Sequence, residues 1–293
     1  MTAFDLFVGI DWSGERGTRL RRLQVAVCAP GDGAPVLVAN PRGGPWSRPD
    51  VIHWLLARSS AARVLCGLDF SFSFPWQDHR AYFPGFADDP ADYAAFWDLV
   101  EAMCFDDECL FGGALADVEP FADHFRRGIM TGEAYRRRLR ETERQAQAGG
   151  RGTPESVFNM VGARQVGKAA LSGMRALRWL NSHDGVAIWP FEPADDARLV
   201  AVEAFPTAFV RLAGEGPGKV RDLSRLDRVL AHYGSRGVGE AWGGEGAGLT
   251  DDMTDALVAA AALRALAADP AMWNPPGLSD SVRRSEGWTF GIL

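Results

Sequence analysis

Four acidic residues stand where they could hold divalent metal ions. Asp11, Asp69 and Glu203 each end or follow an apolar run typical of a buried strand. Asp255 falls on a predicted helix, on the same face as Ala259, Ala262 and Leu266. Carboxylates that converge without basic partners repel one another, so they need a cation to remain ionised. Oxygen ligands suit Mg²⁺ or Mn²⁺, and two such ions about 4 Å apart would clamp a phosphodiester during hydrolysis.

Each of these acids also has a structural explanation. Asp252, the fifth candidate metal ligand, and Asp251 are first-turn acids that favour the helix dipole. Asp69 could cap a turn, and Glu203 could pair with an arginine. The case for a metal site therefore depends on the set, because each of the four principal acids is tied to an apolar element.

The elements that must position these acids indicate an α/β fold. Apolar runs predict strands over 6–10, 23–28, 35–39, 63–69, 185–191 and 199–205. Helices are expected after Ser47, over 93–103, 133–147 and 166–180, after Ser224, and from Thr250 to about 268. We expect one domain over 1–293, a mixed sheet flanked by helices, with a largely helical insertion at about 76–164. The small residues of the last helix would let it approach the sheet closely.

Several short motifs resemble one superfamily. The segments are 8–14 (VGIDWSG), 67–69 (GLD), 202–206 (VEAFP), 252–257 (DMTDAL) and 286–291 (EGWTFG). In this order they resemble the RNase H-like superfamily, and a family of unknown function predicted to be RNase H-like nucleases. The resemblance implies an RNase H-like fold in which Asp11, Asp69, Glu203 and Asp255 hold divalent metals for phosphodiester hydrolysis. It extends less directly to Asp252, and the acidic stretch 85–123 departs from it.

A nuclease also needs a surface for a polyanion. The chain has 31 basic and 38 acidic residues, a net charge of −7, which argues against a broad duplex-binding face. Its basic concentration lies in the insertion, where the predicted substrate-binding residues are Arg136, Arg137, Arg138 and Arg140. On an exposed helix they could contact phosphates of a nucleic acid or nucleotide. The alternative is a solvated helix, or one that pairs with the acidic stretch.

Two other functions compete with the nuclease. In an actin-like or sugar-kinase-like ATP-dependent phosphotransferase, Ser13 and Gly14 would bind phosphate, and the glycine-rich segment 243–248 could serve the adenosine. Residues 162–169 (GARQVGKA) nearly match a P-loop, but Ala169 stands where the motif needs Ser or Thr for Mg²⁺. A non-catalytic RNase H-like binding module is the third possibility, although all four acids are intact.

The remaining sequence features concern location. The four cysteines form no CxxC pair, and no secretory signal or long uncharged apolar segment is visible. We therefore expect a cytoplasmic protein without membrane contact. The sequence does not indicate its oligomeric state.

Overall fold

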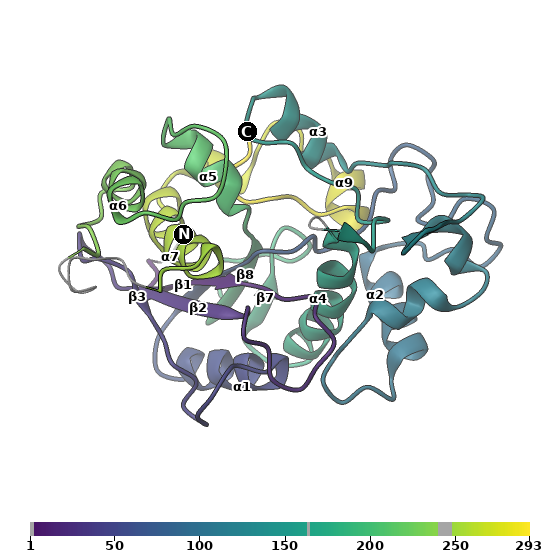
Figure 1. Cartoon of the computed structure of the whole chain (residues 1–293), viewed down its shortest axis with the longest axis horizontal. Coiled ribbons are helices and arrows are strands. Elements are labelled where there is room, and N and C mark those ends of the chain that lie inside the picture. The colour runs from purple at the N-terminus through teal and green to yellow at the C-terminus, as the bar shows by residue number, and fades with distance from the viewer. Residues whose placement is uncertain (1–2, 163–164, 240–247) are drawn as a thin grey trace.

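The computed structural model describes residues 3–162, 165–239 and 248–293, and its centre is a six-stranded mixed sheet (Figure 1). The strands are β1 (Leu6–Asp11), β2 (Gln24–Cys28), β3 (Val36–Leu37), β4 (Val64–Leu68), β7 (Val186–Ile188) and β8 (Leu199–Glu203). They lie in the order β3-β2-β1-β4-β8-β7. β2 runs antiparallel to β1 and β3, whereas β1, β4, β8 and β7 are mutually parallel. Parallel strands bring their carboxyl ends to one edge, where the predicted acids stand.

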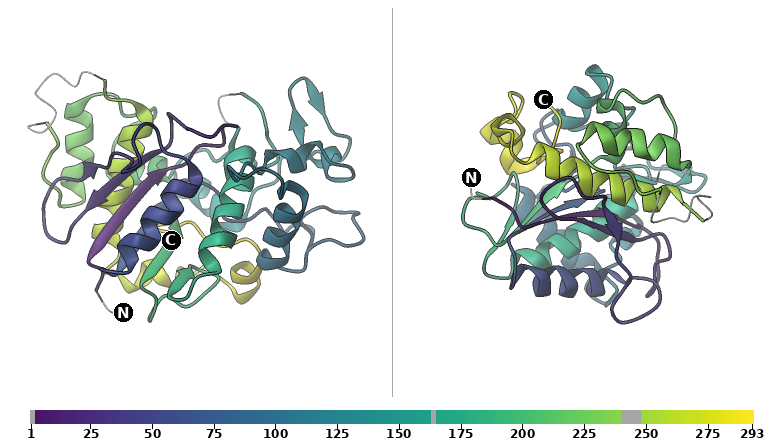
Figure 2. Two further views of the ribbon diagram at one scale, coloured as in Figure 1. Left: turned by 90° about the horizontal axis from the view of Figure 1, so that it is seen from below. Right: turned by 90° about the vertical axis from the view of Figure 1, so that its left-hand side faces the viewer.

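Helices cover both faces of this sheet (Figure 2). One face packs against α1 (Arg48–Ser59) and α4 (Val166–Asn181). The other packs against α5 (Pro206–Leu212), α6 (Leu223–His232) and α7 (Asp251–Leu266), and the short helices α8 (Pro270–Trp273) and α9 (Asp280–Ser285) follow. Alternation along each strand divides the apolar side chains between two cores: Val8 and Ile10 face α1 and α4, and Phe7 faces α7. The prediction of a mixed sheet flanked by helices is confirmed.

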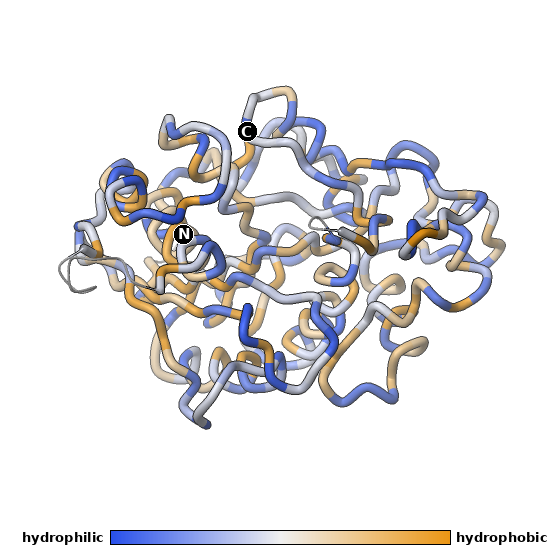
Figure 3. Tube along the Cα trace, viewed as in Figure 1, coloured by the Kyte–Doolittle hydropathy of each residue, from blue (hydrophilic) through white to orange (hydrophobic). Residues whose placement is uncertain are grey.

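Helix α7 lies unusually close to the sheet because the residues between them are small. A Cβ atom built on Gly9, in the middle of β1, would stand 2.2 Å from the carbonyl oxygen of Ala256. The run Ala259–Ala262 on α7 is completely buried. This confirms the predicted close approach and brings the first turns of α7 to the carboxyl edge of the sheet. Figure 3 shows the hydrophobic segments gathered along these central elements.

Local capping signals set most helix starts. The Ser47 hydroxyl accepts from the Asp50 amide at 3.1 Å, and the Thr250 hydroxyl accepts from the Met253 amide at 3.3 Å, as the sequence predicts. The expected cap at Ser224 is wrong. α6 begins two residues earlier, because Asp222 accepts from the Arg225 amide at 2.8 Å.

The insertion between β4 and α4 is only partly helical. It contains α2 (Tyr93–Cys104), two 3₁₀ turns at Gly113–Asp117 and Phe121–His124, the hairpin β5 (Arg126–Arg127) and β6 (Met130–Thr131), and α3 (Glu141–Ala148). The predicted helix over 133–147 is therefore too long at its amino end. The chain before α3 is extended because the Arg138 guanidinium reaches inward to the carbonyls of Pro75, Ala81 and Tyr82. The boundaries of the insertion and the single-domain organisation stay predictions.

Candidate metal centre

Three of the predicted acids meet at the carboxyl edge of the sheet. Asp11, Asp69 and Asp255 each offer a carboxylate oxygen, and these oxygens lie within 4.8 Å of one another. They come from the end of β1, the residue after β4 and the second turn of α7. Such a group of oxygen ligands could hold a metal ion.

Strand register explains why two of these acids share a face. Gly9 pairs with Gly67, so Asp11 and Asp69, each two residues further on, point to the same side of the sheet. That side is covered by α7, where Asp255 lies above the strand ends. The amide of Asp69 donates to the Ile10 carbonyl at 3.0 Å, which continues the ladder beyond β4 and holds Asp69 beside Asp11.

The three carboxylates affect one another's protonation. Burial, followed by the charges of Asp69 and Asp255, raises the pKa of Asp11 well above its ordinary value. Burial, followed by the charge of Asp255, raises the pKa of Asp69 to about 7. Burial also raises the pKa of Asp255, although the Lys219 ammonium opposes this. A cation in the cluster would relieve this cost by favouring the ionised forms.

Lys219 is the neighbour of the carboxylate cluster that the sequence did not reveal. Its Nζ donates a hydrogen bond to Asp255, and its side chain remains 48% exposed. Burial lowers the pKa of Lys219, but the charges of Asp255, Asp69 and Asp11 outweigh burial and raise it. The chain has only two lysines, Lys168 and Lys219, among its 31 basic residues. The rarity of lysine was the one feature of the sequence that set Lys219 apart, and it does not indicate which residues Lys219 contacts.

Glu203 does not join the cluster, which corrects the expectation of four converging acids. Its partner in the register is Leu68, so Glu203 points to the face opposite Asp69. There its two oxygens accept four hydrogen bonds, from the Arg140 guanidinium (2.6 and 2.7 Å), the Thr289 hydroxyl (2.6 Å) and the Phe72 amide (2.8 Å). A carboxylate so fully engaged has no free oxygen lone pair for a metal, and the alternative that Glu203 pairs with an arginine is confirmed.

Asp252 lies at the edge of the cluster. Its carboxylate pairs with Arg22 at 3.2 Å, and its charge contributes to the raised pKa values of Asp11 and Asp255. The start of α7 thus carries two acids: Asp255, inside the cluster, and Asp252, at its edge and paired with the exposed Arg22.

The four insertion arginines do not form the predicted exposed basic surface. Arg138 and Arg140 are buried, the first against Asp78 at 2.6 Å and the second against Glu203. Arg136 is exposed and donates to nearby backbone carbonyls, and Arg137 pairs with Glu155 at 3.5 Å. The alternative, that the basic segment pairs with the acidic stretch 85–123, is met in part. Arg127 pairs with Asp117 at 3.2 Å. The charge of Arg138 also opposes the rise in the pKa of Asp89 that burial causes.

The phosphate-loop candidates lie next to each other. Ser13 is buried and its hydroxyl accepts from the Glu15 amide at 3.2 Å. A Cβ atom on Gly14 would stand 2.4 Å from the Ala169 amide nitrogen, so the first turn of α4 covers this loop. Part of the P-loop-like segment 162–169 lies outside the described residues. Most of the glycine-rich segment 243–248 also lies outside them.

Comparison with protein-family models, curated proteins and solved structures found no match. Within the described ranges, no helix is both long and apolar enough to span a lipid bilayer.

Proposed function

We propose that this protein is a metal-dependent nuclease that hydrolyses phosphodiester bonds. The observation that carries the proposal is the convergence of Asp11, Asp69 and Asp255, from three separate elements, within 4.8 Å. Acids that are distant in sequence and costly to bury together are characteristic of functional sites. The RNase H-like resemblance belongs to the same proposal. It is supported by a first strand that lies inside a mixed sheet, pairs antiparallel with β2 and parallel with β4, and ends in an acid.

The charges of the site fit a divalent cation. Among the described residues, the cluster sets three carboxylates against the Lys219 ammonium, which leaves two negative charges uncompensated when all four groups are ionised. All the donors are oxygens, which favours Mg²⁺ or Mn²⁺ over softer metals. When bound, such an ion polarises a phosphoryl oxygen and lowers the pKa of a coordinated water.

The protein's own residues hold and orient the reactants. Asp11, Asp69 and Asp255 would hold the cation, since their three carboxylates meet on one face of the sheet. Lys219 contributes a fixed positive charge at the exposed edge of the cluster, where an anionic phosphate would arrive. Gly9 contributes indirectly, because it lets α7 approach the sheet and places Asp255 above the strands.

Exposed cations around α7 can replace the arginine surface expected from sequence. Arg22 and Arg221 are each 69% exposed and pair with Asp252 and Asp251 at 3.2 and 3.0 Å. Together with Lys219 they line the first turns of α7 beside the carboxylates. Phosphates of a nucleic acid would compete for these cations, so its affinity should fall as salt rises.

Hydrolysis of labelled single- and double-stranded DNA and RNA with Mn²⁺ tests the proposal. We expect the wild-type protein to cleave at least one polymer, and Asp11→Asn and Asp255→Asn to lose cleavage by at least about a hundredfold, as essential charge stabilisers do. Asp98→Asn is the matched control, because Asp98 is exposed on α2 and its one ion pair within the described residues is with Arg178. It should retain activity.

The same preparations should be tested for ATP turnover. ATP hydrolysis that requires Asp11, with no cleavage of any polymer, would reject the nuclease and favour the phosphotransferase alternative. Metal binding without either activity would favour the non-catalytic binding module.

A further inference from the structure

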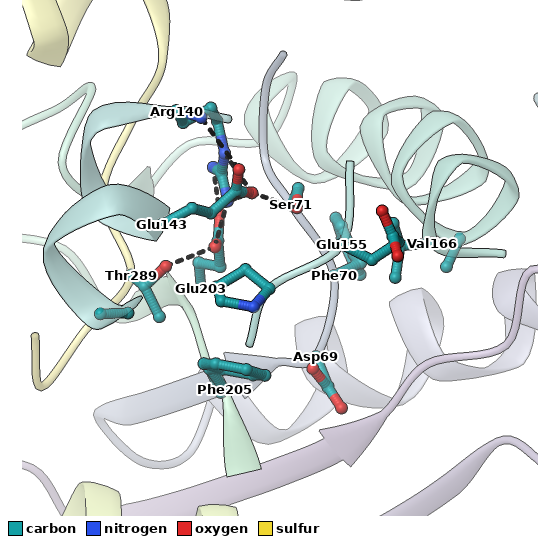
Figure 4. Close-up of a pocket in the computed structure, with 14 residues that line it drawn as sticks. Asp69, Phe70, Ser71, Arg140, Glu143, Glu155, Val166, Glu203, Phe205 and Thr289 are labelled. Carbon is teal, nitrogen blue, oxygen red and sulfur yellow. Dashed lines mark hydrogen bonds and ion pairs between the residues drawn. The ribbon is translucent and has the colours of Figure 1, made fainter. Parts of the chain in front are cut away.

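A cavity adjoins the carboxylate cluster on the side of Asp69 (Figure 4). Its volume is about 100 Å³. A site for one water needs roughly 10–15 Å³, so the cavity has room for a group of several non-hydrogen atoms, the size of a single heterocyclic base. Half of the fourteen described residues that line it are apolar: Phe70, Ala146, Pro154, Val166, Ala169, Ala204 and Phe205.

The polar lining of the cavity disfavours an anion. The carboxylates Glu143, Glu155 and Glu203 line it together with Asp69, and among the described residues that line it the one cationic side chain is Arg140. Arg140 is 1% exposed, and its guanidinium nitrogens donate to Glu143, Glu203 and the Glu286 carbonyl. It therefore has little capacity left to bind a phosphate. A neutral ligand with N–H donors suits this lining best.

Phe205 offers an aromatic face to such a ligand. Its ring packs against the backbone at Gly152, where an added Cβ would stand 3.3 Å from the ring carbons. Within the described part of the chain, Phe205 pairs with no other aromatic ring, whereas the neighbouring Phe70 packs on Trp12 and Phe72. An unpaired aromatic ring on a cavity wall is a stacking platform for a planar base.

Glu155 offers a hydrogen-bond acceptor on the cavity wall. Its Oε1 atom accepts from the Ser156 amide at 2.9 Å and faces Arg137 at 3.5 Å. Its Oε2 atom has no hydrogen-bond partner among the residues that the structure describes. This oxygen can accept from an exocyclic amino group, which cytosine carries and uracil replaces with a carbonyl oxygen.

We infer that this cavity binds the base of the nucleotide next to the scissile phosphate, stacked on Phe205 and read by Glu155. The inference rests on the proposed nuclease function, because Asp69 belongs to both the cavity and the carboxylate cluster. A base paired in a duplex cannot enter this cavity without leaving its stack. The substrate class is therefore single-stranded or locally unpaired nucleic acid, with amino-bearing bases preferred over uracil and thymine.

Equilibrium binding of nucleosides to the full-length protein in EDTA tests the cavity without catalysis. We expect cytidine to bind, uridine to bind more weakly and ribose not to bind, as monitored by ligand-observed NMR titration. Phe205→Ala should weaken cytidine binding by about 5- to 150-fold, the range for loss of one stacked base. Phe105→Ala is the matched control, because Phe105 is exposed and lies outside the cavity lining. It should bind cytidine like the wild type.

Glu155→Gln tests the base preference separately from the stacking. Because the glutamine amide can donate to the uracil carbonyl, this variant should bind cytidine and uridine almost equally. Equal binding of cytidine, uridine and ribose by the wild type would overturn the inference, and so would cytidine binding that Phe205→Ala leaves unchanged.

Cleavage assays separate this inference from the proposed function. Cleavage of single strands with Mn²⁺, without selective cytidine binding, would reject the base cavity and retain the nuclease. Phe205-dependent cytidine binding without cleavage of any polymer would retain a nucleobase site and reject the nuclease. If both hold, replacing the nucleotide at the cleaved bond by an abasic tetrahydrofuran should reduce wild-type cleavage to the level of Phe205→Ala.

Discussion

Asp69→Asn should stabilise the metal-free protein above neutral pH while abolishing its stabilisation by metal. The Asp69 carboxylate lies within 4.8 Å of those of Asp11 and Asp255. The pKa of Asp69 is raised to about 7, whereas an aspartate in an unfolded chain has a pKa of about 3.9. Between these values the folded protein keeps a proton that the unfolded chain has lost. The free energy of unfolding therefore decreases as pH rises from about 4 to about 7, and it remains at the lower value at higher pH.

The magnitude follows from the pKa difference. At about 1.36 kcal/mol for each whole step in pKa, the difference sets an upper limit of about 4 kcal/mol. Coulomb's law gives a similar scale, because two charges 4.8 Å apart at an effective dielectric of about 20 repel by about 3.5 kcal/mol. The partial exposure of Asp69 reduces this cost. We therefore expect Asp69→Asn to gain about 1–3 kcal/mol at pH 8 and almost nothing at pH 4.

Urea unfolding at several pH values, in EDTA and in Mn²⁺, measures this effect. In EDTA the wild type should lose stability between pH 4 and 7, and the variant should lose less. At Mn²⁺ about a hundredfold above Kd, the wild type should gain about 2.7 kcal/mol and the variant should gain little. Asp98→Asn, on the exposed surface of α2, should behave like the wild type throughout. A variant less stable than the wild type at pH 8 in EDTA would refute the argument from repulsion.

Three further predictions follow from the contacts around the site. Lys219→Met removes the cation that competes with a metal for the carboxylates, so Mn²⁺ should bind several-fold more tightly by calorimetry; weaker binding would contradict this role. Arg140→Met leaves Glu203 buried without its partner and should lower the free energy of unfolding in urea by about 3–5 kcal/mol. An unchanged free energy of unfolding would contradict a stabilising role for this ion pair. Gly9→Ala forces α7 away from the sheet and should lower the midpoint of thermal unfolding far more than Gly33→Ala, where nothing lies within 4 Å of an added Cβ; equal midpoints would disprove the close approach.

Sequence patterns predicted the central elements well because their signals are local. The apolar runs before Asp11 and Asp69 become β1 and β4, and the hydroxyl of Thr250 starts α7 as expected. Helical periodicity also placed Asp255 on the face of α7 that packs on the sheet. The three acids of the cluster could therefore be named from sequence, although their mutual distance could not.

The arginine-rich segment shows where local patterns fail. Its polar composition predicts an exposed helix, yet Arg138 and Arg140 are drawn into the interior by partners distant in sequence. The burial of an arginine depends on whether the fold supplies carboxylates and carbonyls for its five N–H groups. Helical periodicity contains no information about those partners, because they are distant in sequence.

Sequence alone thus determined which residue types end the strands and which face of α7 meets the sheet, since both depend on neighbours along the chain. Tertiary structure decided that Glu203 points away from Asp69, because its face depends on the register between β4 and β8. It also brought Lys219 to Asp255 from a loop and opened the cavity beside Phe205. These features arise where segments far apart in sequence pack together, and strand alternation reverses with a register shift of a single residue.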